Sequence, residues 1–169
     1  AGLAEGRHRG APFNDGDFYK WIEAASATFA ITHDDVLDRS LDRSIAVIAK
    51  AQRDDGYLHT PVLIAQRRGD TNAAACQDRN NFEMYNLGHL MTAAAMHHRA
   101  TGKTNLLAVA VKAADFLERT FGNASPDAAR SSVCPSHYMG IVDLFRVTHE
   151  PRYLELAKRF FALRGEIKD

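Results

Sequence analysis

The sequence has little cysteine, only two among 169 residues. Two are too few for the disulfide framework of a small secreted domain or for a four-cysteine zinc site. No apolar run approaches the roughly 20 residues that cross a bilayer, so no membrane partner is expected. Lysine plus arginine and aspartate plus glutamate each number 21, which leaves no excess of either charge. The chain therefore lacks the basic field that neutralises phosphates, and no nucleic-acid partner is expected.

The signatures of several enzyme classes are also missing. The sequence contains no G-x-S-x-G elbow, P-loop, G-x-G-x-x-G or H-E-x-x-H motif. Cys134 and His137 suggest a thiol–imidazole pair, but a separation of three residues does not establish a geometry. The segment Ala1–Ala11 lacks the apolar core of a signal peptide, and the compartment stays unknown.

Apolar residues are present in a clear helical pattern. They recur every three or four residues along most of the chain, as they do on helices that bury one face. Only Val62–Ile64 is a candidate strand. The predicted fold is all-α, with helices at 17–31, 34–53, 82–100, 104–121, 136–147 and 151–164.

The predicted helices pair into three αα-hairpins that resemble one another. Thr101 aligns with Thr148, and Thr32 aligns more weakly with Thr101. The repeat is longer than the roughly 34 residues of tetratricopeptide or ankyrin units, which leaves an open HEAT-like solenoid or a closed α/α toroid. Long links between hairpins and short links within them favour the toroid. We predict one partial domain over residues 1–169, about half of an (α/α)6 toroid.

The toroid brings its long loops to the end where the inner helices begin. Helix N-termini carry unpaired N–H groups and partial positive charge, and a cleft there is the expected site. The candidate substrate-binding residues at this end are Asn14, Asp15, Asp17, Glu83 and His137. Two of the three carboxylates could flank a glycosidic bond.

Each candidate also has an ordinary structural interpretation. Asp15 or Asp17 suits the N-cap of the first helix, Glu83 suits a helix dipole, and Ser136 is a good N-cap before His137. The rings of Tyr19 and Trp21, beside the two aspartates, are candidates for the apolar face of a sugar. Asn86 and Tyr85 follow Glu83 and are candidates to face the same cavity.

Other residues have weaker indications. His89 is more typical of a hydrogen-bonded core histidine than of a ligand. His97 and His98 lie at the opposite end, where they suit the negative helix C-terminus. The polar segment Gln66–Arg79 is a candidate lid.

Motifs spread along the chain carry a family resemblance. They are Asn14–Ala24, Gln52–Leu58, Glu83–Leu90, Ala100–Lys103, His137, Leu144–Thr148 and Arg152–Ala157. In order and spacing they resemble the β-L-arabinofuranosidase-type glycoside hydrolases. The resemblance covers nearly the whole chain and implies an (α/α)6 catalytic barrel that acts on sugar linkages.

The resemblance also implies which chemistry this span lacks. In the family, a cysteine nucleophile sits at a zinc site of cysteines and a glutamate, and another glutamate is the acid/base. All of these lie in the second half of the barrel, so we expect no catalytic residue, metal ligand or cofactor here, and zinc only in the other half. Cys76 and Cys134 are not assigned to these roles. His137 matches a substrate-contacting histidine, whereas Phe82 replaces another, which suggests a different sugar or a degenerate site.

The sequence therefore predicts part of a glycoside hydrolase for plant- or microbe-derived glycans, similar to the arabinofuranosidases. This span supplies substrate-binding residues. The alternatives are a non-catalytic helical-repeat binding module and an α/α-barrel epimerase or lyase. The expected partners are a carbohydrate and either the remainder of the barrel or a second copy of the chain, because half a toroid leaves two apolar flanks.

Overall fold

The computed structural model describes residues 8–123 and 135–166, and within these ranges it is helical. The elements are α1 (Asn14–Thr32), α2 (Asp35–Ala51), α3 (Thr60–Arg67), the 3₁₀ turn η1 (Arg79–Asn81), α4 (Glu83–Thr101), α5 (Asn105–Phe121), α6 (Ser136–Thr148) and α7 (Pro151–Glu166). All six predicted helices form. No described helix is both long and apolar enough to cross a membrane.

The candidate strand Val62–Ile64 is wrong, because these residues lie in α3. Proline is favoured in the first turn of a helix, where its missing N–H has no partner to lose, and Pro61 occupies that turn. Val62 and Leu63 bury their side chains on one side of this short helix. A short apolar run is compatible with either element, and the proline and the core contact favour the helix.

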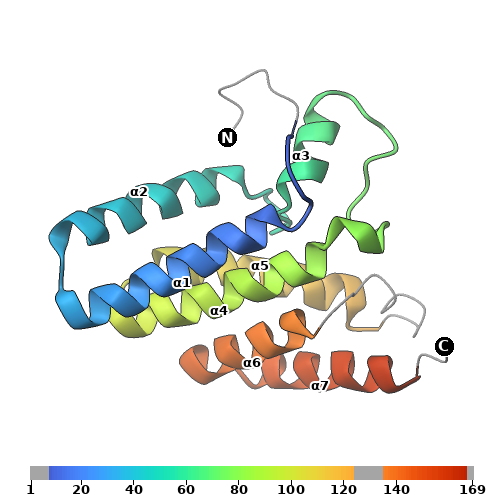
Figure 1. Cartoon of the computed structure of the whole chain (residues 1–169). Coiled ribbons are helices and arrows are strands. Elements are labelled where there is room, and N and C mark those ends of the chain that lie inside the picture. The colour runs from blue at the N-terminus through green and yellow to red at the C-terminus, as the bar shows by residue number, and fades with distance from the viewer. Residues whose placement is uncertain (1–7, 124–134, 167–169) are drawn as a thin grey trace.

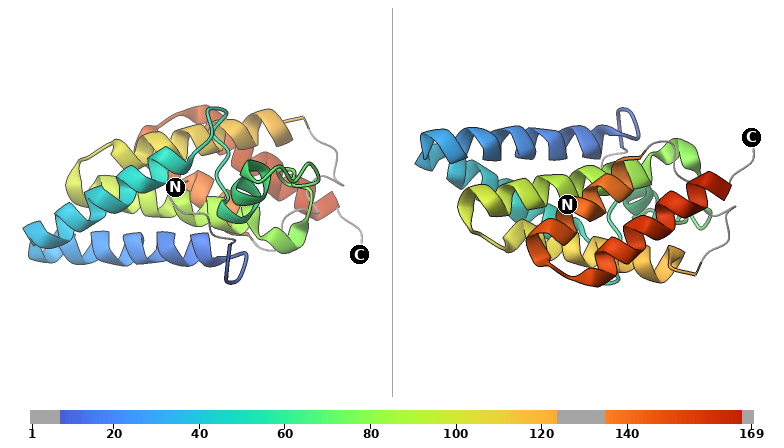
Figure 2. Two further views of the ribbon diagram at one scale, coloured as in Figure 1. Left: turned by 90° about the horizontal axis from the view of Figure 1, so that it is seen from above. Right: turned by 90° about the horizontal axis from the view of Figure 1, so that it is seen from below.

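Three antiparallel hairpins build the molecule in two layers (Figure 1). The inner layer is α1, α4 and α6, with α4 in contact with both neighbours. The second layer is α2, α5 and α7, each packed on the helix that precedes it in its hairpin. Figure 2 shows α1 and α4 toward one side and α5 and α7 toward the other. The inner helices all begin at the same end of the molecule, where α3 also lies.

The three hairpin turns share one hydrogen-bonding pattern. Each inner helix ends on a threonine whose hydroxyl donates to the carbonyl four residues earlier, at 2.7–3.0 Å. The same hydroxyl accepts the N–H two residues later, at 3.1–3.4 Å. The residue between adopts a left-handed conformation that ends the helix. The threonines are Thr32, Thr101 and Thr148, the residues that align in the sequence.

The first two hairpins are joined through the turn of the second. Lys103 lies in that turn and forms ion pairs with Asp38 and Asp42 on α2, at 2.6 and 2.7 Å. The other end of α2 is tied to α5, because the Gln52 amide donates to the Val109 carbonyl at 2.9 Å. Neighbouring hairpins are therefore connected at both ends of α2.

The core is centred on α4, which is buried against α1, α5 and α6. Eleven residues of this helix are buried, and many of them are small. Small side chains allow three helices to approach it, and a helix buried on most of its circumference loses the simple amphipathic stripe. The remaining stripe of α4 is partly exposed and comprises Tyr85, His89, Thr92, Met96 and Arg99.

Candidate functional site

The start of α1 is fixed against the first turn of α4 by Asn86. The Asn86 side chain accepts the Gly16 N–H at 2.8 Å and donates to the Pro12 carbonyl at 2.9 Å. A Cβ on Gly16 would lie 2.7 Å from both Asn86 Oδ1 and Tyr85 Cε1. Only glycine allows this approach, so the Asn-Asp-Gly-Asp segment closes α1 onto α4.

Asp15 turns toward α3 and not toward the first turn of its own helix. Its carboxylate accepts the Thr60 N–H at 2.7 Å and lies 3.6 Å from Nδ1 of His59. His59 is fully buried, and burial lowers the pKa of its imidazole to about 4, although the Asp15 charge opposes this shift. His59 is therefore neutral at pH 7, and Asp15 anchors the start of α3.

The start of α6 is pressed against α4 through two glycines. A Cβ on Gly88 would lie 2.6 Å from the backbone nitrogen of His137. A Cβ on Gly140 would collide with the Gly88 carbonyl. This contact carries His137 to within two turns of the start of α4. Its ring is 2% exposed and lies edge-on to Phe160, with ring centroids 4.6 Å apart.

Glu83 opens α4 but is only 2% exposed. Its Oε2 accepts the backbone N–H of Cys76, which has a left-handed conformation in the preceding loop. Burial raises the pKa of the Glu83 carboxyl, while hydrogen bonding within this loop partly opposes the shift. Burial is also the main cause that raises the pKa of Cys76 and of the neighbouring Tyr57. Glu83 therefore holds the loop before α4.

Asp17 is the most exposed carboxylate of the set and faces α4. Its side chain is 52% exposed and pairs with Lys20 at 3.2 Å. Lys20 also donates to the Tyr85 hydroxyl and lies over the Tyr85 ring. His89 packs edge-on against the same ring, and burial, assisted by the Lys20 charge, lowers the pKa of His89. These four side chains form one polar cluster between α1 and α4.

The structure places the first turns of α1, α4 and α6 together, but the predicted residues on them differ in solvent exposure. Asn14 and Asp17 are exposed, Asp15 is partly covered, and Glu83 and His137 are buried. Their substrate-binding roles stay predictions.

Three local predictions at this end are wrong. Neither Asp15 nor Asp17 caps α1, whose N-cap is Phe13 without a side-chain hydrogen bond. Pro135, and not Ser136, occupies the N-cap position of α6. Tyr19 is 3% exposed in the core, so its ring does not face a sugar, whereas Trp21 is 42% exposed and stacks on Phe18, and its role stays a prediction.

The weaker predictions have mixed outcomes. His89 is half-buried and in ring contact, whereas His97 is fully buried. His98 Nδ1 lies 3.0 Å from the Lys103 carbonyl. Cys134, the proposed partner of His137, lies outside the described residues.

The comparisons with known proteins decide the family. The family model described as the GH127 catalytic domain of β-L-arabinofuranosidase matches residues 1–167. The chain belongs to this family. It is 34% identical over 166 residues to a non-reducing end β-L-arabinofuranosidase of Bifidobacterium longum subsp. longum, which covers 98% of this chain and 25% of that protein.

Solved structures agree with this assignment. A GH127 β-L-arabinofuranosidase from Geobacillus stearothermophilus T6 superposes with a TM-score of 0.85 at 30% identity, over 98% of this chain and 25% of that one. A second GH127 β-arabinofuranosidase superposes with a TM-score of 0.79 at 32% identity, over 98% of this chain and 27% of that one. A protein described as a glycoside hydrolase superposes with a TM-score of 0.74 at 47% identity, over 93% of this chain and 23% of that one. The predicted fold, tandem αα-hairpins forming part of an (α/α)6 toroid, is confirmed. The chain spans about a quarter of the length of these relatives.

Some motifs of this GH127 chain have structural roles. In the segment Gln52–Leu58, the Gln52 amide bonds the Gly56 carbonyl, and Asp55 accepts the Tyr57 N–H. Gly56 has a φ of 91° and lies against the backbone of Lys112, so no side chain fits there. The segment therefore locks the end of α2 onto α5.

Sequence reasoning missed His59 and Lys20 at this end of the GH127 chain. His59 precedes a short helix that was not predicted, and no pattern in the sequence connects it with Asp15. Lys20 lies one turn from Asp17, a spacing that predicts an ion pair but not the contact with Tyr85.

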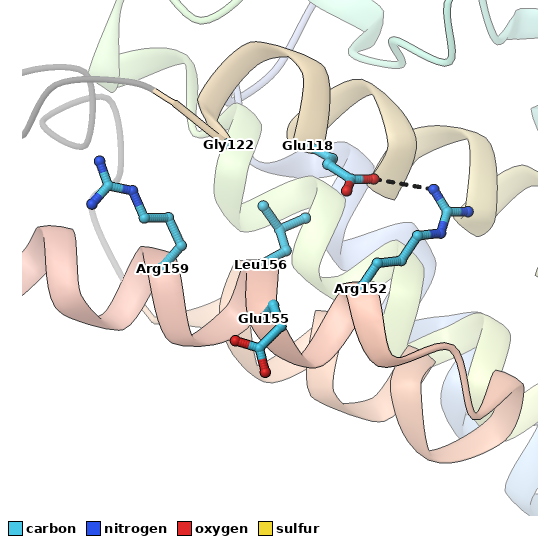
Figure 3. Close-up of a pocket in the computed structure, with 6 residues that line it drawn as sticks. All are labelled: Glu118, Gly122, Arg152, Glu155, Leu156 and Arg159. Atoms are coloured by element: carbon cyan, nitrogen blue, oxygen red, sulfur yellow. Dashed lines mark hydrogen bonds and ion pairs between the residues drawn. The ribbon is translucent and has the colours of Figure 1, made fainter.

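Grooves in the GH127 chain lie both beside α3 and on the outer layer. Two grooves of about 360 and 270 Å³ flank α3, at the end where the inner helices begin. A groove of about 420 Å³ lies between α5 and α7 (Figure 3). There Arg152 is already paired with Asp115 and Glu118, at 2.8 and 3.0 Å. In residues 8–123 and 135–166, no three histidine, cysteine or acidic side chains are grouped to hold a metal ion.

Proposed function

We propose that this chain is the N-terminal half of the (α/α)6 catalytic barrel of a glycoside hydrolase. The enzyme acts on arabinofuranose-type linkages of plant- or microbe-derived glycans, and this span forms one wall of the sugar site. The observation that carries the proposal is that the first turns of α1 and α6 both pack closely against the start of α4, at Gly16 and at Gly88. The GH127 match over residues 1–167 supports it and favours an enzyme over a binding module, an epimerase or a lyase.

The residues of this wall bind and orient the substrate. Asp17 and Lys20 offer a carboxylate and an ammonium group at an exposed position, where they can bond sugar hydroxyls. Burial lowers the pKa of His89, so its neutral ring can both donate and accept a hydrogen bond. Glu83 and His137 are buried and fix the walls of the site. The nucleophile and its zinc, which would hold the thiolate, belong to the other half by resemblance.

The rest of the same protein is the partner that completes the barrel. Relatives are about four times as long as this chain, which supports a continuous barrel over a pair of identical halves. The apolar residues exposed on the first and the last of the three hairpins are then covered by further hairpins.

The test uses the full-length protein and 4-nitrophenyl β-L-arabinofuranoside. We expect hydrolysis with release of a reducing sugar. Asp17→Ala should raise KM about tenfold, since a lost hydrogen bond to a charged group is worth about 1.5 kcal/mol. Asp35→Ala, an exposed aspartate in the first turn of α2 at the opposite end, is the matched control. Sugar binding without hydrolysis, or unsaturated products, would contradict the proposal.

A further inference from the structure

Four aromatic rings form a continuous series of edge-on contacts between the start of α1 and the start of α4. Phe13 meets Phe82 edge to face at 5.5 Å between centroids, and Phe82 meets Tyr85 at 6.1 Å. Tyr85 in turn meets His89 at 4.5 Å. We call these four residues the aromatic wall. It joins the segment before α1 to the first two turns of α4.

The rings of the wall are held in place yet remain partly open to solvent. Phe82 has a left-handed backbone with φ of 56°, an unusual conformation for a bulky residue that persists only where its surroundings impose it. The Phe82 N–H donates to the Arg79 carbonyl at 3.3 Å, and the Glu83 side chain accepts the Cys76 N–H in the same loop. Phe13 is 38% exposed, and Phe82 is half-buried. Apolar ring surface thus lies fixed and uncovered at the end of the molecule where the inner helices begin.

Polar groups lie directly beside this apolar surface. Lys20 covers the Tyr85 ring and bonds its hydroxyl, and Asp17 pairs with Lys20 at 3.2 Å. The Tyr85 ring is therefore occupied, and the available ring surface is that of Phe13 and Phe82. Binding sites commonly combine aromatic walls with a few polar groups that fix the orientation of the ligand. A sugar has the matching chemistry, because hydroxyls surround an apolar C–H face.

We propose that Phe13 and Phe82 form a subsite that packs on the C–H face of a sugar residue, while Asp17 and Lys20 bond its hydroxyls. The inference rests on the proposed function and adds the residue that sets specificity. The Phe82 side chain cannot form a hydrogen bond. A sugar hydroxyl that faces it therefore loses its hydrogen bonds to water and gains none in return. The subsite selects sugars that present C–H groups, and not a hydroxyl, at this position.

The experiment measures KM and kcat of the full-length protein on 4-nitrophenyl furanosides and pyranosides. Phe82→Leu keeps an apolar side chain but removes the flat ring, and we expect KM on the preferred glycoside to rise about tenfold, with kcat changed less than about twofold. Phe82→Tyr keeps the ring and should restore KM. The control is Phe29→Leu, a half-buried phenylalanine at the far end of α1 that also makes an edge-on ring contact, with His33 at 5.7 Å.

The outcomes separate the subsite from the proposed function. Unchanged KM and sugar preference in Phe82→Leu, in an enzyme that hydrolyses glycosides, overturns the subsite and leaves the function standing. Equal losses in Phe82→Leu and Phe29→Leu, with a matching fall in melting temperature, show a folding effect and also overturn it. Failure of the unmodified protein to bind or hydrolyse any sugar of the panel contradicts both.

Discussion

At the scale of single residues, His97 is a buried histidine whose two ring nitrogens have no hydrogen-bond partner among the described residues. It is fully buried near the end of α4. Burial lowers the pKa of His97, the Lys103 charge acts in the same direction, and Asp42 and Asp38 oppose it. The prediction that this side chain serves the helix C-terminus overlooked its burial, because the sequence gives no sign of which face of α4 meets the core.

His97 should make the fold sensitive to acid. When a histidine has a lower pKa in the folded than in the unfolded state, its contribution to stability is complete at pH values above the unfolded-state pKa of about 6.5. That contribution is lost as the pH falls from about 6.5 toward the folded-state pKa. In His97→Leu, the melting temperature should fall less between pH 7 and pH 5. At pH 7 the variant should be equal or more stable by about 1 kcal/mol, since two unpaired nitrogens are removed.

Thermal unfolding of the full-length protein, followed by circular dichroism, checks this. His33→Asn at an exposed turn is the control, because asparagine also tolerates the left-handed backbone found there. An acid response identical in His97→Leu and the unmodified protein would refute the prediction.

At the scale of elements, the threonine that ends each inner helix determines the hairpin turn. Thr101 donates to the His97 carbonyl and accepts the Lys103 N–H, at 2.7 and 3.1 Å. Thr101→Val keeps the shape and removes both bonds, so we expect a loss of about 1 kcal/mol of unfolding free energy. Thr28→Val is the control, because among the described residues the Thr28 hydroxyl makes only the intrahelical bond, to Ala24 at 2.9 Å. Equal losses in urea unfolding of the two variants would show that the turn bond adds nothing.

The contact between α4 and α6 depends on Gly88. Alanine there would force the two backbones apart, because its Cβ would overlap Ser136 and His137. We expect Gly88→Ala to cost about 1–3 kcal/mol, as overpacking does, and to lower activity by displacing His137. Gly165→Ala, in α7 with open space around it, should be neutral or stabilising by about 1 kcal/mol. Wild-type stability in Gly88→Ala, measured by chemical denaturation, would disprove the close packing of these helices.

At the scale of the whole molecule, apolar side chains are exposed on the first and the last of the three hairpins. Phe18 and Trp21 stack on α1 at 43% and 42% exposure. Met139 on α6 and Phe161 on α7 are 58% and 69% exposed. Surfaces of this kind mark interfaces. They lie where a closed barrel would continue on both sides of these three hairpins.

Residues 1–169 produced alone should therefore self-associate. We expect light scattering coupled to size-exclusion chromatography to report species larger than 18.7 kDa. Phe18→Lys combined with Phe161→Lys should shift the distribution toward monomer, because a charge on each edge opposes apolar contact. Ala30→Lys combined with Ala162→Lys, at exposed positions of α1 and α7, adds the same two charges without removing an apolar ring and is the control. A compact, folded monomer of the unmodified chain would contradict the prediction.

The sequence by itself determined the helices, their pairing and the repeated turn, because these depend on the spacing of apolar residues and on local threonine bonds. It also determined the family, because the order and spacing of the motifs can be recognised without knowing how the helices pack. Only the tertiary structure decided which side of each helix faces the core. That decision placed Tyr19 and Glu83 inside, turned Asp15 toward His59, and set Phe82 against Phe13. Contacts between residues far apart in the chain, such as Gly16 with Asn86, depend on how helices pack, and no local pattern records them.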